Sequence, residues 1–137
     1  MREILFRGKR IRPDNDTGKI EWVYGLYMTV YGTPNIELED GRECDVDAET
    51  VGQYTGLTDK NGTQVFEGDI LKSKEYGRQQ GDKNFSGYDI FEVRFVDGAY
   101  VIRNSDRLFY LLRGADKEVI GNIYDNPELL EVESNGV

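Results

Sequence analysis

Two short runs of acidic and amide side chains before a glycine resemble binding sites for a metal ion. Residues 59–62 (Asp-Lys-Asn-Gly) and 14–18 (Asp-Asn-Asp-Thr-Gly) space their oxygen-bearing side chains as calcium loops do. An EF-hand loop needs glycine at its sixth position and glutamate at its twelfth, but a count from Asp59 puts Gly62 fourth and Ile70 twelfth. We therefore predict that both runs are turns in which Asx side chains accept hydrogen bonds from the local backbone, with no metal bound.

Other acidic side chains could in principle bind Mg²⁺ or act as acid and base in a metal-dependent enzyme. The candidates are Asp40, Glu43, Asp45 and Asp47. Because the chain has 26 Asp and Glu residues, some carboxylates are expected to lie close together without any function. We keep a carboxylate enzyme only as a minor hypothesis, which an absence of tight Mg²⁺ or Mn²⁺ binding would count against.

Composition excludes the commoner enzyme chemistries. With His 0, the chain has no Ser-His or Cys-His nucleophile pair and no imidazole ligand for zinc. The single cysteine, Cys44, excludes an intrachain disulfide, and its acidic neighbours Glu43 and Asp45 disfavour a thiolate. No Gly-x-Gly-x-x-Gly motif or phosphate-binding Gly-Lys-Ser/Thr loop is present. We therefore expect no enzyme activity, no catalytic residue and no cofactor.

Charge is distributed unevenly along the chain. The formal net charge is -9, so the surface as a whole repels nucleic-acid phosphate and anionic membranes. Residues 1–12 are basic, whereas residues 37–50 hold seven acids against Arg42 alone. We interpret both segments as solvated surfaces, with contact between the basic arm of one subunit and the acidic segment of another as the alternative. No apolar run suits a signal peptide or a membrane span, and we expect a cytoplasmic protein.

Apolar residues recur with a period of two, which predicts a mainly β fold. The first half contains predicted strands at residues 4–6 and 20–31, a turn at 14–18, and one short strand near Ile36 and Leu38 in an otherwise polar stretch. The second half contains predicted strands at residues 65–72 and 118–124 and a strand or helical turn at 108–112. Asn126 is predicted to cap a short helix at residues 127–133, with Pro127 as its first residue. The long polar connection 73–87 is a candidate binding loop or an excursion without a role.

The clearest local structure is a hairpin over residues 88–104. Asp97-Gly98 lies between two runs rich in β-branched and aromatic residues, which predicts a two-residue turn. That turn determines the register, with Glu92 opposite Arg103 in a favourable pair worth about 0.2–1 kcal/mol. The expected pairs are Val96 with Ala99, Phe95 with Tyr100, Val93 with Ile102 and Phe91 with Asn104. The face predicted to form the core carries Phe91, Val93, Phe95, Tyr100 and Ile102.

The most specific motif of the chain lies at residues 51–71, VGQYTGLTDKNGTQVFEGDIL. Together with two further segments, this motif resembles the YopX family of phage and prophage proteins from Gram-positive bacteria. Residues 4–8 (ILFRG) with 21–25 (EWVYG) resemble the start of that family, and residues 119–130 (VIGNIYDNPELL) resemble its end. The resemblance covers most of the chain apart from residues 32–50 and 73–87.

The resemblance implies an SH3-like small β-barrel with additional strands and a short C-terminal helix, and no known activity. We expect a single domain over residues 1–137, in which a strand pair within 1–50 packs on a barrel core within 51–130. The signature either specifies the geometry of the barrel, with a tight turn at 59–62 and a bend at Gly68, or forms a binding site. The candidate binding residues are Gln53, Tyr54, Asp59, Asn61, Glu67 and Asp69.

The sequence favours a non-enzymatic module that binds a host or phage protein or its own copies. Surplus tyrosines support a protein-binding patch, because tyrosine is enriched at interfaces and a basic groove for stacked bases is missing. The alternative is an acidic nucleic-acid mimic that inhibits a host DNA-binding protein through the acids of residues 37–49. Direct nucleic-acid binding through residues 1–12 and 72–83 is, like the carboxylate enzyme, a minor hypothesis.

Overall fold

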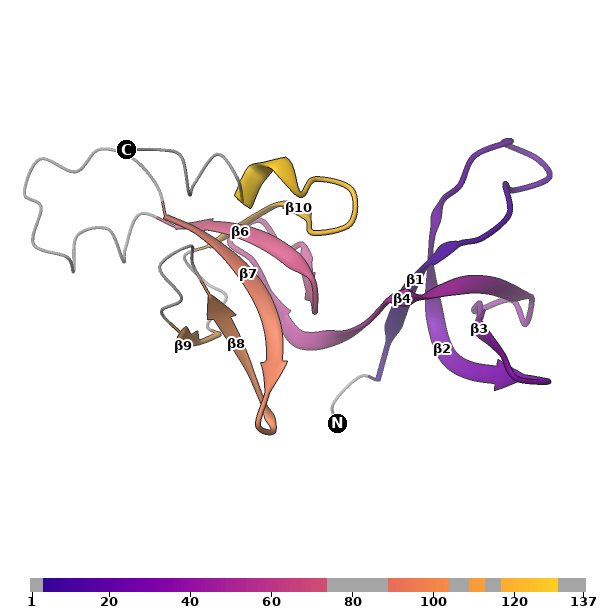
Figure 1. Cartoon of the computed structure of the whole chain (residues 1–137), viewed down its shortest axis with the longest axis horizontal. Coiled ribbons are helices and arrows are strands. Elements are labelled where there is room, and N and C mark those ends of the chain that lie inside the picture. The colour runs from indigo at the N-terminus through magenta and orange to yellow at the C-terminus, as the bar shows by residue number, and fades with distance from the viewer. Residues whose placement is uncertain (1–3, 74–88, 104–108, 113–116, 131–137) are drawn as a thin grey trace, which may run out of the picture. The chain divides into compact units, whose positions relative to one another are not determined.

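The computed structural model describes residues 4–73, 89–103, 109–112 and 117–130, and its secondary structure is almost entirely β (Figure 1). The chain separates into two compact units, Met1–Tyr54 and Thr55–Val137, each with its own hydrophobic core. In the described part of the chain, no helix is long and apolar enough to cross a membrane. The expected mainly β fold is confirmed.

The first unit is a small barrel of antiparallel strands. These strands are β1 (Phe6–Arg10), β2 (Trp22–Val30), β3 (Thr33–Glu37) and β4 (Glu43–Thr58). Each strand pairs with the next, and an additional pairing of β1 with β4 closes the ring. The 16 residues of β4 make closure possible, because its beginning lies beside β3 and its later part lies beside β1.

The barrel interior is small and tightly packed. Its buried residues are Val23, Ile36, Cys44 and Val46, with Phe6, Leu38 and Val51 packed against them. Gly25 in β2 lies so close to β3 that an added Cβ would overlap the backbone oxygen of Glu37. Glycine is therefore required here by close approach of two strands, with no positive φ involved.

The second unit contains a sheet of five antiparallel strands in the order β10-β6-β7-β8-β9. The strands are β6 (Asp69–Ser73), β7 (Asp89–Val96), β8 (Ala99–Arg103), β9 (Phe109–Leu111) and β10 (Glu118–Asn122). The short strand β5 (Gln64–Phe66) lies beside β4. The core of this unit consists of Val65, Leu71, Phe91, Val93, Ile102 and Leu112.

The structure confirms the predicted hairpin and its register. Val96 lies opposite Ala99, Phe95 opposite Tyr100 and Val93 opposite Ile102, while the Phe91–Asn104 pair falls outside the described residues. Glu92 accepts a hydrogen bond from Arg103, with 3.4 Å between Oε1 and Nη2. Phe95 is the exception to the predicted core. It lies in the second residue pair from the turn, is 51% exposed, and contacts the Tyr100 ring in an edge-to-face arrangement.

Several predicted strand boundaries were wrong. β1 begins at Phe6, two residues later than the predicted start, and the polar stretch after Gly32 contains β3 and the beginning of β4 where one short strand was expected. β4 was not predicted, although Cys44 and Val46 alternate as buried residues with exposed or half-buried acids, a pattern typical of a strand. Acidic residues are depleted in strands, and this bias hid the alternation. The closed ring consequently lies within the first unit, whereas the barrel was expected within residues 51–130.

The remaining elements largely follow the sequence expectations. The predicted strand 65–72 is divided into β5 and β6 by Glu67-Gly68, where Gly68 has a φ of 92°. β10 ends at Asn122, two residues early, because a turn begins at 123. A helix starts at 128, with the Leu129 N–H donating to the Asn126 carbonyl at 3.1 Å. The Asn126 side chain accepts instead from the N–H of Asn122, and the predicted end of the helix, the tail and the loop 74–88 lie outside the described residues.

Candidate functional site

Asp59, the central residue of the family-like signature, bonds to the backbone of its own turn and of β10. Its Oδ1 accepts N–H hydrogen bonds from Asn61 at 2.8 Å and Thr63 at 2.9 Å. Its Oδ2 accepts from the N–H of Val119 at 2.9 Å, although Val119 lies 60 residues away in sequence. The Asx turn predicted at 59–62 is confirmed, and the same carboxylate ties that turn to the start of β10.

The bonds to Asp59 stabilise its ionised form. Burial by itself would raise the pKa of this carboxyl group, because it disfavours the charged state. The N–H groups of Val119, Thr63 and Asn61 have the opposite effect and together hold the pKa below its ordinary value. The side chain is only 5% exposed, so little of the carboxylate is accessible to an external ligand.

Gly68 and Asp69 likewise bond within the second unit. The Gly68 N–H donates to the carbonyl of Val93, and its own carbonyl accepts from Ile123, each at 2.9 Å. Asp69 is 2% exposed, and its Oδ2 accepts from the N–H of Phe66 at 2.7 Å. These bonds join the bend between β5 and β6 to β7 and to the turn after β10, as expected if the signature specifies geometry.

The six candidate binding residues are divided between the two units. Gln53 and Tyr54 belong to the first unit, where the N–H of buried Tyr54 donates to the carbonyl of Leu5 at 2.7 Å. Asn61 is exposed at the turn, and Glu67 lines a small pocket of about 160 Å³ in the second unit. A binding role for these residues therefore stays a prediction.

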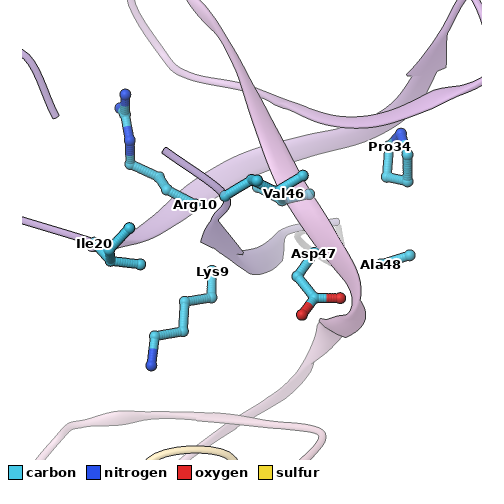
Figure 2. Close-up of a pocket in the computed structure, with 8 residues that line it drawn as sticks. Lys9, Arg10, Ile20, Pro34, Val46, Asp47 and Ala48 are labelled. Atoms are coloured by element: carbon cyan, nitrogen blue, oxygen red, sulfur yellow. The ribbon is translucent and has the colours of Figure 1, made fainter. Parts of the chain in front are cut away.

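A larger pocket of about 550 Å³ opens in the first unit where strand ends converge on β4 (Figure 2). We call it the strand-end pocket; it is lined by Lys9, Arg10, Ile11, Ile20, Pro34, Val46, Asp47 and Ala48. The register explains the convergence: Lys9 of β1 lies opposite Asp47, and Asn35 of β3 lies opposite Asp45. β1 and β3 thus reach the same stretch of β4 from its two sides.

An irregularity in β4 shapes the pocket wall. The register between β1 and β4 shifts between Arg7 and Lys9, so that Arg7 is paired with Gly52 and Lys9 with Asp47. Thr50 bridges this bulge, since its Oγ1 accepts from the N–H of Lys9 at 2.8 Å and donates to the carbonyl of Asp47 at 2.6 Å. The bulge leaves Ala48 exposed at the pocket edge.

Charged groups around the pocket contact or face other groups of the same chain. Arg10 donates to the carbonyl of Arg12 at 3.0 Å and to the Cys44 Sγ at 3.4 Å, and it forms an ion pair with Asp14 at 3.6 Å. Lys9 and Asp47 are cross-strand neighbours of opposite charge. The pocket therefore offers apolar walls with little net charge and suits an uncharged, partly apolar occupant.

Sequence reasoning missed the strand-end pocket but identified the segments that form it. Arg12 and Asp45 form an ion pair at 3.8 Å, so the basic segment 1–12 meets the acidic segment 37–50 within one chain. The sequence suggests solvated surfaces for both segments, or contact between subunits, whereas this ion pair lies within one chain. The available signal in the sequence was a pair of isoleucines, Ile11 and Ile20, near the predicted 14–18 turn. The structure leaves them 54% and 45% exposed at the pocket.

The described acids do not gather into a metal site. No group of three or more potential metal ligands occurs in the residues that the structure describes. In the turn at 14–18, Asp14 Oδ1 accepts from the N–H groups of Asp16 at 2.7 Å and Thr17 at 3.1 Å, which confirms the predicted Asx turn. Those two N–H bonds come first among the causes that lower the pKa of Asp14.

Comparison with known proteins supports the resemblance seen in the sequence. The family model described as YopX protein matches residues 16–131. Among solved structures, the chain is similar to protein EF1440 from Enterococcus faecalis, with 27% identity, 95% of this chain and 99% of that chain covered, and a TM-score of 0.51. A search of curated proteins finds no match.

Proposed function

The chain belongs to the YopX protein family, and on that premise we propose that it is a non-enzymatic protein-binding module. The observation that carries the proposal is the strand-end pocket, a recess of about 550 Å³ with half-exposed isoleucines at its rim. Pockets of roughly 300–1,000 Å³ with mostly apolar walls commonly bind small ligands or side chains. Binding rather than catalysis also agrees with a sequence that lacks histidine.

The chemistry of the pocket favours a protein side chain over nucleic acid. Phosphate recognition needs cations that are available to the ligand, whereas Arg10 already contacts Asp14, Cys44 and the Arg12 carbonyl. An apolar side chain with at most one polar tip would cover Ile11 and Ile20 and leave the charged neighbours undisturbed. We propose that the partner is a phage or host protein in the bacterial cytoplasm, or another copy of the chain.

Nucleic-acid mimicry is less well supported by the geometry. Arg42 donates to both carboxylate oxygens of Asp40, at 3.0 Å from its N–H and 2.8 Å from its Nε. The backbone bond is the leading cause that lowers the pKa of Asp40. Two of the acids that a phosphate mimic would display, Asp40 and Asp45, therefore have arginine partners. Under mimicry, neutralising Glu37, Glu39, Asp40 and Glu43 would abolish binding.

The test compares capture by the wild-type chain with capture by Ile20→Asp, which places a charge at the pocket rim. Ile20 is half exposed and lies before β2, so the substitution should leave the fold intact. Leu111→Asp, in the second unit, is the matched control because Leu111 is also exposed. Tagged chains would be incubated with bacterial lysate at two salt concentrations, and captured proteins would be quantified by mass spectrometry and then purified for direct titration.

We expect a defined protein to bind the wild type and Leu111→Asp and to bind Ile20→Asp at least about tenfold more weakly. Because the pocket walls are apolar, that binding should persist at the higher salt concentration. Equal binding of the purified partner to all three chains would contradict the proposal. Loss of all captured proteins at high salt would favour the electrostatic alternative.

A further inference from the structure

The β2–β3 turn presents a fully exposed aromatic ring. Val30 pairs with Thr33, so the hairpin closes through the two residues Tyr31 and Gly32. Both have positive φ, 50° for Tyr31 and 80° for Gly32, and the Tyr31 residue is 104% exposed. A bulky side chain at positive φ is rare, and here no burial compensates for it.

A second hairpin turn in the same chain shows which residues suit this backbone conformation. Val96 pairs with Ala99 through Asp97 and Gly98, whose φ values are 51° and 83°. The two turns thus have closely similar backbone, and the second uses Asp-Gly, a standard choice for such hairpins. The turn geometry consequently does not account for tyrosine at position 31, which points to a role outside the folded chain.

The exposed ring and the strand-end pocket belong to one region of the barrel. Pro34, which lines the pocket, follows the turn by two residues and pairs with Thr29 across the hairpin. In Figure 2, Pro34 and Ile20 lie on opposite sides of the view, with Arg10 and Val46 between them. Pro34 therefore connects the turn that carries Tyr31 to the lining of the pocket.

We propose that Tyr31 of one copy inserts into the strand-end pocket of a second copy, and that the second copy returns the same contact. This inference rests on the proposed function, because it uses the same pocket and names the occupant. A two-fold interface requires one surface patch to carry both a protrusion and its complement. The hairpin turn and the pocket beside Pro34 meet that requirement, whereas a foreign partner would not need both on one patch.

Charge also favours Tyr31 as the occupant. The pocket walls are apolar, and the cross-strand charges Lys9 and Asp47 offset each other. A tyrosine side chain is uncharged, with an apolar ring and one hydroxyl group that can bond to polar atoms at the rim. Each copy carries a net charge of -9, but the pocket lining includes charges of both signs. Contact at the pocket therefore adds less repulsion than contact between two wholly acidic surfaces would.

The test measures self-association of the full chain by sedimentation velocity over a range of concentrations. Tyr31→Asn removes the ring and inserts a residue that the turn prefers, so the melting temperature should stay equal or rise. We expect this variant and Ile20→Asp each to raise the dimer dissociation constant at least about tenfold, with Leu111→Asn unchanged. A purely structural role for Tyr31 would instead lower the melting temperature and leave association intact.

Mixing the two weak variants tests reciprocity. Tyr31→Asn keeps an intact pocket and Ile20→Asp keeps an intact ring, so a mixed dimer retains one of the two contacts. The mixture should associate more tightly than either variant alone and less tightly than the wild type. A mixture no tighter than its components would overturn the proposal.

The outcomes separate this inference from the broader function. A wild-type chain that remains monomeric at the highest attainable concentration refutes the exchange of Tyr31, while a foreign protein lost only with Ile20→Asp would preserve the pocket as a binding site. A dimer dissociation constant that is unchanged in both Tyr31→Asn and Ile20→Asp also refutes the exchange. If, in addition, no captured protein responds to Ile20→Asp, both proposals fail.

Discussion

At the scale of single residues, Asp59 shows how a motif that resembles a ligand site can serve the fold. Its carboxylate accepts three backbone N–H bonds, two from its own turn and one from β10. A calcium ion would compete for the same oxygens. The spacing of residues 59–62 predicted the turn, but only the structure shows the bond that joins it to Val119.

We expect Asp59→Ala to destabilise the chain by roughly 1–3 kcal/mol, because buried N–H groups lose their acceptor. Since the pKa of Asp59 is lowered in the folded state, its contribution is present above the unfolded pKa of about 3.9 and is lost as pH falls through the lower folded pKa. Urea titrations across this acidic range would check both effects. A variant whose stability equals that of the wild type at neutral pH would contradict the assignment.

At the scale of elements, close strand approach and strand length determine the barrel. β2 and β3 lie close together at Gly25, and β4 continues past its pairing with β3 to reach β1. Thr50 satisfies the backbone where the β1–β4 register shifts. The strand-end pocket exists because these three features bring strand ends together at one stretch of β4.

Gly25→Ala should destabilise the first unit by about 1–3 kcal/mol, because its Cβ overlaps the backbone oxygen of Glu37 and the strands must move apart. Leu26→Ala, one residue later and exposed, is the matched control and should change stability by no more than about 0.5 kcal/mol. Chemical denaturation of both variants gives the comparison. Equal stability of the two variants would show that β2 and β3 can separate without cost.

At the scale of the whole molecule, the chain has two compact units with separate cores. Val23, Ile36, Cys44 and Val46 form one core, and Phe91, Val93 and Ile102 are among the residues of the other. The boundary falls within β4, between Tyr54 and Thr55. Separate cores predict that the units can open independently, since each buries its own apolar surface.

Hydrogen exchange followed by mass spectrometry should separate the two units. Gly25→Ala is expected to reduce protection in peptides from the first unit and to leave β6–β8 protected. Asp59→Ala is expected to reduce protection in peptides from the second unit and to leave the first unit protected. Loss of protection throughout the chain in both variants would show that the two units unfold as one.

Local sequence determined the features whose partners are near in the chain. Asp97-Gly98 specified the β7–β8 register and the Glu92–Arg103 pair, and residues 14–18 and 59–62 specified their Asx turns, because each depends on interactions over a few residues. The signature residues were identified as well, although their bonds to β7, β10 and the turn after β10 were not.

Only the tertiary structure decided how distant segments combine. The closing pair of β1 with β4 joins residues about forty positions apart, and alternation within each segment does not say which segments will pair. The same pairing brings the basic segment to the acidic one and creates the strand-end pocket. The sequence by itself therefore determined the mainly β character of the chain, its turns and one hairpin. Ring closure and the strand-end pocket arose from long-range packing, which local patterns do not encode.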